Sequence, residues 1–262
     1  MNFKIKLFFC FIILNSQAFT IDQKLIPILF YQNSSKGGDW VYENRQLHIF
    51  GAGIQASYNN ENWNISARFI QFGFLGNVND GLFKFSPHQN FPYIDGSKDA
   101  DGFWSEHLDT KISYTKNSLI IEFGKFDRHW GFGKRSIYLS KKVPSYPQFG
   151  INWEINDRLR LIYFHGFLNS GIIDSSRSNF YKNSFSRRTI DIPKNIASHR
   201  IEWIFNPNIK IGLNESVIYA FRNIDVHYLI PFAPFYPIEN YLGDIDNIQM
   251  GLDASFKIKK NF

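Results

Sequence analysis

The residues best suited to ligand chemistry gather in one glycine-punctuated segment, residues 124–140. Its cationic and aromatic members are Arg128, His129, Trp130, Lys134, Arg135 and Tyr138. Aromatic rings can stack on the faces of sugars. Guanidinium and ammonium groups pair with carboxylates through charge-assisted hydrogen bonds. The segment therefore predicts recognition of uronates or other acidic sugars, with binding of lipopolysaccharide phosphates or simple solvation of the cations as the alternatives.

A second basic segment follows in residues 169–195. It carries Arg177, Arg187 and Arg188, and its basic residues outnumber its two acids, Asp174 and Asp191. We predict that these arginines extend the same binding surface.

Two other constellations suggest different chemistry. His107 and Asp109 are two residues apart, so they share one face of a strand and could activate water in a hydrolase. No serine nucleophile signature accompanies them. Asp95, Asp99 and Asp101 have a spacing that can converge on calcium, but the segment lacks the bidentate glutamate of a full calcium loop. We predict no catalysis, no metal and no cofactor.

Composition limits the fold. The chain has 262 residues, of which 18% are aromatic and 20% charged, and its mean hydropathy is -0.26. The aromatic content is too high for a disordered chain, and the hydropathy is too low for a bundle of membrane helices. No Pro/Gly/Ser-rich linker divides the chain, which favours one domain. The formal charge of +6 is not clustered as nucleic-acid binding requires.

The N-terminus has the pattern of a secretory signal peptide. Lys4 and Lys6 precede an apolar run at residues 7–14, and small residues before position 19 offer a cleavage site. We expect residues 1–18 to be removed and residues 19–262 to form the domain. The single cysteine, Cys10, lies in the signal, so the mature domain has no disulfide.

Period-two alternation dominates the rest of the chain. In residues 247–257 one face is wholly apolar and the other polar, and residues 148–155 and 63–69 repeat the pattern. Short polar turns near positions 60, 117, 157, 207 and 260 alternate with long loops at 75–101, 127–146, 169–195 and 220–246. Outer-membrane barrels have this asymmetry of short periplasmic turns and long extracellular loops. A soluble β-sandwich or lipocalin-like barrel is the alternative.

Strand parity gives the topology. The strand at 45–58 ends in a short turn, so it must run toward the periplasm, and a strand that runs outward must precede it. Residues 24–32, which include Pro27, are expected to form that strand. The count is then about ten strands in an all-β, antiparallel, transmembrane outer-membrane β-barrel. Residues 259–261 resemble a turn, so we favour a chain cut from a larger barrel over a complete small barrel ending at Phe262.

The block from Arg128 to Ser140, with Pro144 and Pro147 after it, resembles the "R-W-G-P-G…S-L-L-L-S-N-N-A-P" block of the Wzi-like capsule-assembly family of outer-membrane barrels. Phe132 stands where that family usually has proline. Weaker similarity extends over most of residues 120–253. The resemblance implies a surface lectin that retains or organises capsular polysaccharide.

The sequence thus predicts a barrel in the outer membrane of a Gram-negative bacterium. Its expected partners are capsular or other surface polysaccharide, outer-membrane lipid and lipopolysaccharide, and the barrel-assembly machinery, with no nucleic acid. A general porin is the principal alternative function, and an outer-membrane hydrolase is the lesser one.

Overall fold

The computed structural model describes residues 22–34, 47–76, 102–133, 136, 138–139, 145–180 and 190–257. The predicted signal segment, the Asp95, Asp99 and Asp101 trio, and Lys134, Arg135, Arg187 and Arg188 lie outside the described residues.

Ten antiparallel strands form one sheet in sequence order, as the alternation predicts. The first five are β1 (Asp22–Ser34), β2 (Leu47–Asn59), β3 (Trp63–Gly76), β4 (Gly102–Lys116) and β5 (Leu119–Phe126). The others are β6 (Tyr146–Asn156), β7 (Leu159–Ile173), β8 (Asp191–Asn206), β9 (Ile209–Ala220) and β10 (Asn247–Phe256). Pro27 lies in β1, at an edge of the sheet, where a residue without an N–H is tolerated.

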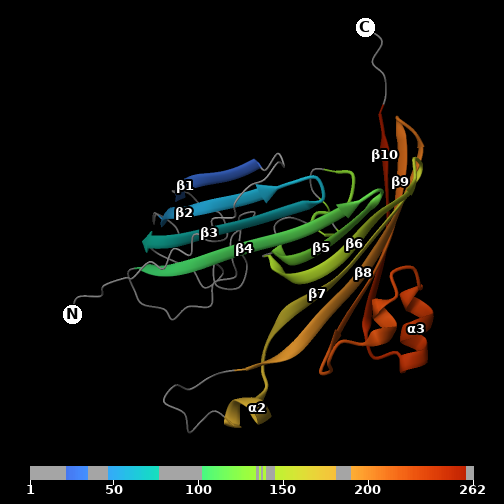
Figure 1. The fold of residues 1–262 in the computed structure, drawn as a ribbon. Coiled ribbons are helices and arrows are strands. Elements are labelled where there is room, and N and C mark those ends of the chain that lie inside the picture. The colour runs from blue at the N-terminus through green and yellow to red at the C-terminus, as the bar shows by residue number, and fades with distance from the viewer. Residues whose placement is uncertain are drawn as a thin grey trace.

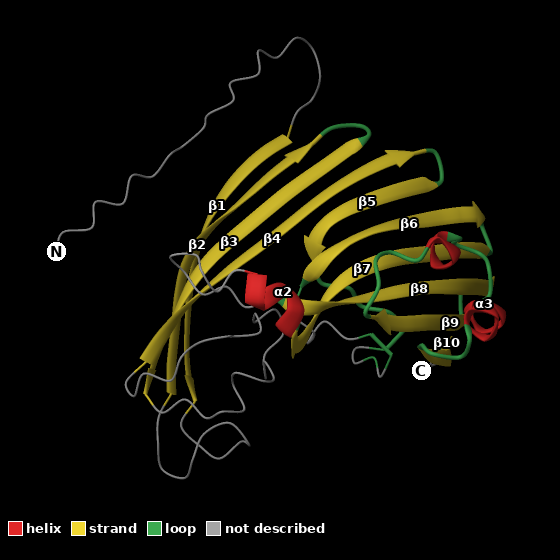
Figure 2. Cartoon of the chain, turned by 90° about the horizontal axis from the view of Figure 1, so that it is seen from below, coloured by secondary structure: helices red, strands yellow, loops and turns green. Residues whose placement is uncertain are grey.

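The sheet is open within the described residues, with β1 and β10 at its two ends (Figure 2). It is also strongly twisted, so that β1–β4 run across the direction of β7–β10 (Figure 1), as the handed twist of strands accumulates over a large sheet. The all-β, ten-strand prediction is therefore confirmed, while closure into a barrel is not seen in these strands.

Asparagine side chains build the short turns. Oδ1 of Asn60 accepts hydrogen bonds from the backbone N–H groups of Asn62 and Trp63, and Oδ1 of Asn156 does the same for Arg158 and Leu159. Asn117 adopts a left-handed backbone with φ of 53°. Asparagine suits these positions because its side chain bonds the backbone two residues on and tolerates that conformation. The predicted turns near 60, 117, 157 and 207 are confirmed.

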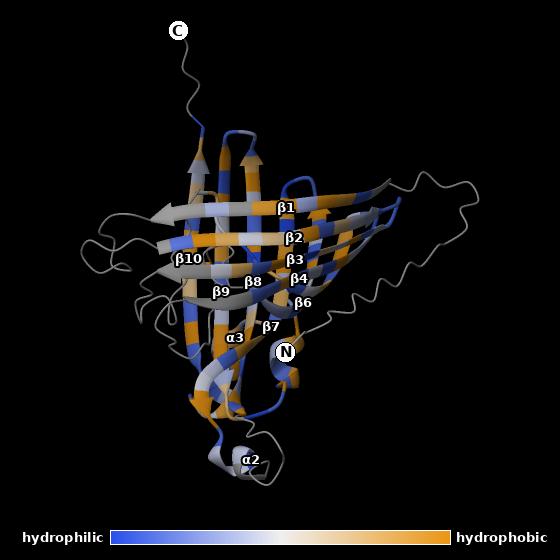
Figure 3. Cartoon of the chain, turned by 90° about the vertical axis from the view of Figure 1, so that its left-hand side faces the viewer, coloured by the Kyte–Doolittle hydropathy of each residue, from blue (hydrophilic) through white to orange (hydrophobic). Residues whose placement is uncertain are grey.

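The sheet has a polar face and an apolar face, which appear as alternating bands along the strands (Figure 3). On β8, Arg200 and Glu202 belong to the polar face, and Ile201 and Trp203 to the apolar face. Charged side chains of the polar face lie in pairs: Arg68 with Asp109, Lys111 with Glu122, and Arg200 with Glu202.

Aromatic side chains of the apolar face lie beside the short turns. Trp63 packs against Tyr114 with ring centroids 4.8 Å apart, and Trp203 stacks on Phe205 at 4.6 Å. Trp153 and Trp203 are 42% and 52% exposed. We call this set, with Trp153, the aromatic row.

Two long connections fold back onto the sheet, on opposite faces. The described residues between 127 and 139, called the inner loop, cover the polar face, where Trp130, Tyr146, Ile162 and Phe164 form a buried cluster. Residues 221–246, called the cap, cover part of the apolar face and contain η1 (Val226–Leu229) and α3 (Phe235–Leu242). Figure 1 shows α3 beside the last strands. The connection predicted at 169–195 is shorter than expected, because β7 extends to Ile173, β8 begins at Asp191, and α2 (Ser175–Phe180) lies between them.

The cap is anchored by buried polar contacts. The Glu215 carboxylate accepts the backbone N–H groups of Phe235 and Tyr236, both at 2.9 Å, at the start of α3. The hydroxyl of Tyr163 donates to the carbonyl of Tyr228 at 2.9 Å. Tyr228 and Phe235 are fully buried against β7, β8 and β9. The cap is thus packed onto the sheet, although its residues 221–246 add no strand to it.

Acid should loosen the cap through Asp225. Burial raises the pKa of Asp225, but hydrogen bonds from the His227 side chain and backbone, and the charges of His227 and Arg222, outweigh it, so the pKa lies below its ordinary 3.8. A lowered carboxyl pKa contributes stability that is fully present above the unfolded pKa and is lost as pH falls through the folded one. Hydrogen exchange of residues 221–246 should therefore show less protection below about pH 3.8 than at pH 6, and Asp225→Asn should reduce that difference.

The matched control for this prediction is Asp157→Asn, which changes an exposed carboxylate in a short turn. Equal loss of cap protection in acid in wild type and Asp225→Asn would show that protonation of Asp225 does not loosen the cap.

Candidate functional site

The inner loop places Trp130 inside the fold. The backbone N–H of Trp130 donates to the carbonyl of Leu139 at 3.0 Å, which closes the loop into a bridge. The indole meets the ring of Phe164 edge-on, with ring centroids 5.0 Å apart, and lies parallel to the ring of Tyr138, with centroids 6.1 Å apart. Only 4% of Trp130 is exposed. The side chain predicted to stack on sugars is therefore largely occupied by aromatic neighbours of the protein.

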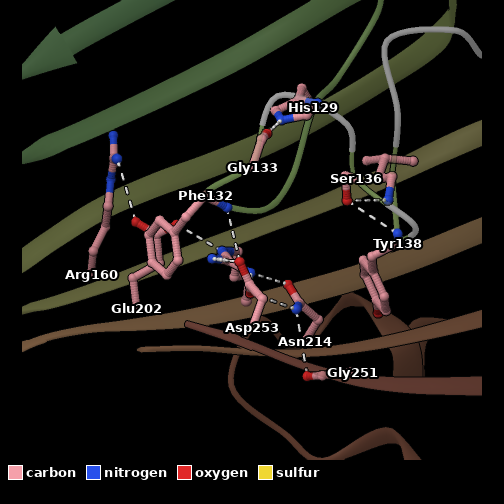
Figure 4. Close-up of polar contacts among 12 residues, drawn as sticks. His129, Phe132, Gly133, Ser136, Tyr138, Arg160, Glu202, Asn214, Gly251 and Asp253 are labelled. Carbon is pink, nitrogen blue, oxygen red and sulfur yellow. Dashed lines mark hydrogen bonds and ion pairs between the residues drawn. The ribbon is translucent and has the colours of Figure 1, made fainter. Parts of the chain in front are cut away.

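The loop crosses the polar face as far as β10 (Figure 4). The backbone N–H of Phe132 donates to Oδ2 of Asp253 at 2.9 Å. The hydroxyl of Tyr138 lies 2.6 Å from Oγ of Ser216. A Cβ on Gly251 would lie 3.0 Å from the Tyr138 ring, so glycine leaves room for it. A connection that starts after β5 thus reaches the last strands of the sheet.

Arg200 is the centre of the polar contacts beneath the loop. It is 1% exposed, and its guanidinium donates to Glu202 at 2.7 Å, to Asn214 at 2.7 Å and to Asp253 at 2.5 Å. The same group lies 4.8 Å from the centroid of the Phe132 ring. Gly212 faces it across the strand pair, where a Cβ would come within 2.1 Å of the guanidinium. Position 212 must therefore be glycine, because any side chain there would overlap the buried guanidinium of Arg200.

Arg128 forms a second buried ion pair. Its guanidinium donates to Glu122 at 2.9 Å and to Gln148, and Glu122 also pairs with Lys111. Burial lowers the pKa of Arg128, and the charge of Glu122 acts in the opposite direction. Arginine stays protonated in proteins under such conditions. These contacts occupy the Nε and Nη2 donors of Arg128, so those donors are not free to bind a ligand.

A polar cavity of about 290 Å³ lies between the loop and strands β4–β8. Its lining comprises Lys111, Glu122, Phe126, Asp127, Arg128, His129, Trp130, Gly131, Asn152, Arg160, Ile162, Arg200 and Glu202. Three predicted residues, Arg128, His129 and Trp130, thus meet at one site. Half-buried His129 places Nε2 2.9 Å from the carbonyl of Gly133.

Arg160 lines this cavity with a guanidinium that forms one hydrogen bond and two longer ion pairs. Its Nε donates to Asn152 at 2.6 Å, while the terminal nitrogens lie 3.8 Å from Glu202 and 3.9 Å from Glu154. Those two separations are too long for hydrogen bonds. The side chain is 34% exposed. The terminal N–H groups of Arg160 therefore have no hydrogen-bond acceptor among the described residues, and Arg160 is part of the cavity lining.

Sequence reasoning did not single out Arg160. The available signal is its parity: Arg160 follows the turn at Asn156 and falls on the polar face, opposite Glu202 in the neighbouring strand. Two other predicted residues, Tyr138 and Arg177, do not line the cavity. Tyr138 packs beside Trp130, and Arg177 is exposed on α2.

The His107 and Asp109 pair predicted for the hydrolase alternative does form. Nε2 of His107 lies 2.8 Å from Oδ1 of Asp109, and Arg68 binds the other carboxylate oxygen. His107 is 1% exposed. An imidazole held by a carboxylate is one component of general-base catalysis, and the hydrolase stays a prediction. Among the described residues, no group of three or more His, Cys, Asp or Glu side chains is placed to hold a metal ion.

No helix in the described part of the chain is long and apolar enough to cross a membrane. Comparison of the chain with protein-family models, with curated proteins and with solved structures finds no match. Its resemblance to the Wzi-like capsule-assembly family stays a prediction.

Proposed function

We propose that this chain forms the wall of an outer-membrane β-barrel in a Gram-negative bacterium, and that its polar face binds acidic surface polysaccharide, such as capsule. The observation that carries the binding proposal is the cavity beneath the inner loop, in which Arg160 keeps free donors beside His129 and Trp130. The role is capsule assembly or attachment, without catalysis.

The two-faced sheet supports the membrane placement. The uncovered part of the apolar face exposes large side chains on several strands, including Phe69, Leu108, Phe123, Ile201 and Leu252. Soluble monomers rarely expose apolar patches of such extent. The aromatic row lies at the short-turn end of this surface, where a membrane interface would lie. In lipid the edge groups of β1 and β10 require hydrogen-bonding partners, which barrel closure supplies.

The cavity chemistry supports an acidic ligand. Its cations are Lys111, Arg128, Arg160 and Arg200, and its carboxylates are Asp127, Glu122 and Glu202. Because Arg200, Arg128 and Lys111 bind acids of the protein at hydrogen-bond distance, a sugar carboxylate would meet Arg160. A charge-assisted hydrogen bond of this kind contributes about 1.5 to 3 kcal/mol. His129 and Asn152 line the same space, and the amide of Asn152 can hydrogen-bond a sugar hydroxyl.

The test replaces Arg160 by glutamine and measures binding of the detergent-folded chain to polygalacturonate, with neutral dextran for comparison. Loss of one charge-assisted bond should weaken binding about tenfold or more. Higher salt should weaken the wild type more than the variant, since screening acts on the charge term. Folding should survive, because Arg160 is part-exposed and its carboxylate contacts are long.

Arg158→Gln is the matched control, since Arg158 is exposed in the adjacent turn and does not line the cavity. It removes the same charge two residues away and should leave binding within about twofold of wild type. If Arg160→Gln and Arg158→Gln both bind polygalacturonate as tightly as wild type, the glycan site is not in this cavity.

One observation favours a porin as the second candidate. The inner loop lies across the polar face, where opposed cations and carboxylates of the cavity would line a water-filled passage. Lumenal charges of this kind tune the selectivity of membrane barrels. Ion conductance in planar bilayers without affinity for polygalacturonate would establish this role in place of the lectin.

A further inference from the structure

The cap holds Arg222, Asp225 and Asp246 in mutual contacts and exposes many of its apolar side chains. Arg222 pairs with Asp246 at 2.5 Å and with Asp225 at 3.3 Å, and the hydroxyl of Tyr228 donates to Asp246 at 2.7 Å. The exposed large apolar side chains of the cap are Phe221, Ile224, Val226, Ile230, Phe232, Tyr236, Tyr241 and Ile245. A segment that faced only water would expose its charges and bury these side chains.

An apolar groove of about 670 Å³ runs between the cap and strands β8–β10. One wall comes from the start of α3, with Pro234, Tyr236 and Pro237. The floor is two cross-strand rows of the apolar face, which are His199, Glu215 and Met250, and then Ile201, Leu213 and Leu252. Its volume falls in the range of roughly 300 to 1,000 Å³ that is common for small-ligand sites.

Glu215 and Nε2 of His199 bind within the protein, while Nδ1 of His199 is buried and has no hydrogen-bond partner among the described residues. Both oxygens of Glu215 accept backbone N–H groups of α3, and Nε2 of His199 lies 3.0 Å from the same carboxylate. The imidazole also packs against the ring of Phe235 at 4.4 Å. The carboxylate is therefore engaged by the cap, and the surface that remains for a ligand is aliphatic and aromatic.

The open side of the groove is continuous with the rest of the apolar face. Ile201, Leu213 and Leu252 are 41%, 52% and 70% exposed, and they pair directly across three strands. The next row toward the short turns contains Trp203, which belongs to the aromatic row. A ligand that lies in the groove therefore extends along the surface that the proposed function assigns to lipid.

We propose that this groove holds an acyl chain of a membrane lipid, and that the cap thereby rests on the bilayer. The inference rests on the proposed membrane placement and adds a specific lipid site at α3. An acyl chain fits because it is apolar along its length and requires no hydrogen-bonding partner from the groove.

The experiment uses the full chain with Cys10→Ser and a single bimane-labelled cysteine, in vesicles of phosphatidylcholine with or without dibrominated acyl chains. Met250→Cys reports on the groove, Phe123→Cys on the apolar face outside it, and Gln249→Cys on the opposite face of β10. Brominated chains should quench the labels at positions 250 and 123 but not at 249. Quenching at 123 without quenching at 250 would overturn the groove while the membrane placement stands. Quenching at neither position would overturn both.

A titration in detergent separates a bound chain from general lipid contact. Dibrominated phosphatidylcholine should quench the label at 250 with saturation at low lipid content, and quenching at 123 should rise without a plateau. Leu213→Glu places a charge in the groove floor and should raise the half-saturating lipid content about tenfold. Ile121→Glu, an equally exposed position of the apolar face outside the groove, should not. Unsaturable quenching at 250, or equal effects of both glutamates in folded protein, would overturn the proposal.

Discussion

Replacing Arg200 by methionine should reduce the free energy of unfolding by about 3 to 5 kcal/mol, because removal of one partner of a buried ion pair leaves the other uncompensated. Arg200 is 1% exposed and holds Glu202 and Asp253 together beneath the inner loop. Without it, two carboxylates face each other with Asn214 between β8 and β10. Urea unfolding of the chain in detergent micelles, followed by the mobility difference between unheated and boiled samples, measures the loss.

The second variant separates charge from packing. Adding Asp253→Asn to Arg200→Met removes an orphaned carboxylate and should restore part of the lost stability, which a simple packing defect would not allow. Arg158→Met is the matched control at an exposed turn and should stay within about 0.5 kcal/mol of wild type. A midpoint for Arg200→Met equal to that control would show that the network does not stabilise the fold.

Trp130→Ala should also cost about 3 to 5 kcal/mol, the range for truncation of a buried large aromatic side chain. The indole packs on Phe164 and Tyr138 and closes the cluster that seats the inner loop on the polar face. We expect a lower urea midpoint and easier proteolysis of residues 127–145. Glycan binding should fall as well, because the loop forms part of the cavity.

Trp130→Phe is the comparison, since it keeps an aromatic ring in the cluster and should lose less stability than the alanine variant. The pattern differs from that of Arg160→Gln, which should lose binding while folding normally. If Trp130→Ala keeps wild-type stability and loses only glycan affinity, the side chain contacts sugar and not the core.

The sequence alone determined the strands and their turns. The alternation in residues 247–257 and 148–155 predicted β10 and β6, and the asparagines at 60, 117 and 156 marked the tight turns. These features depend on side-chain period and on local hydrogen bonds within a few residues, so they can be recognised without knowing the rest of the fold. The same parity placed His107 and Asp109 on one face, and the structure brings their side chains together.

Only the tertiary structure decided where the long connections go. A loop rich in Arg128, Trp130 and Tyr138 reads from sequence as an exposed binding loop, yet its partners Phe164, Ser216 and Asp253 lie as much as 121 residues away. The cap likewise depends on Glu215 and Tyr163, which belong to strands. Such contacts form because burial and hydrogen bonding compensate for the entropy of closing long loops. That balance depends on which surfaces the assembled sheet presents, and local pattern does not contain it.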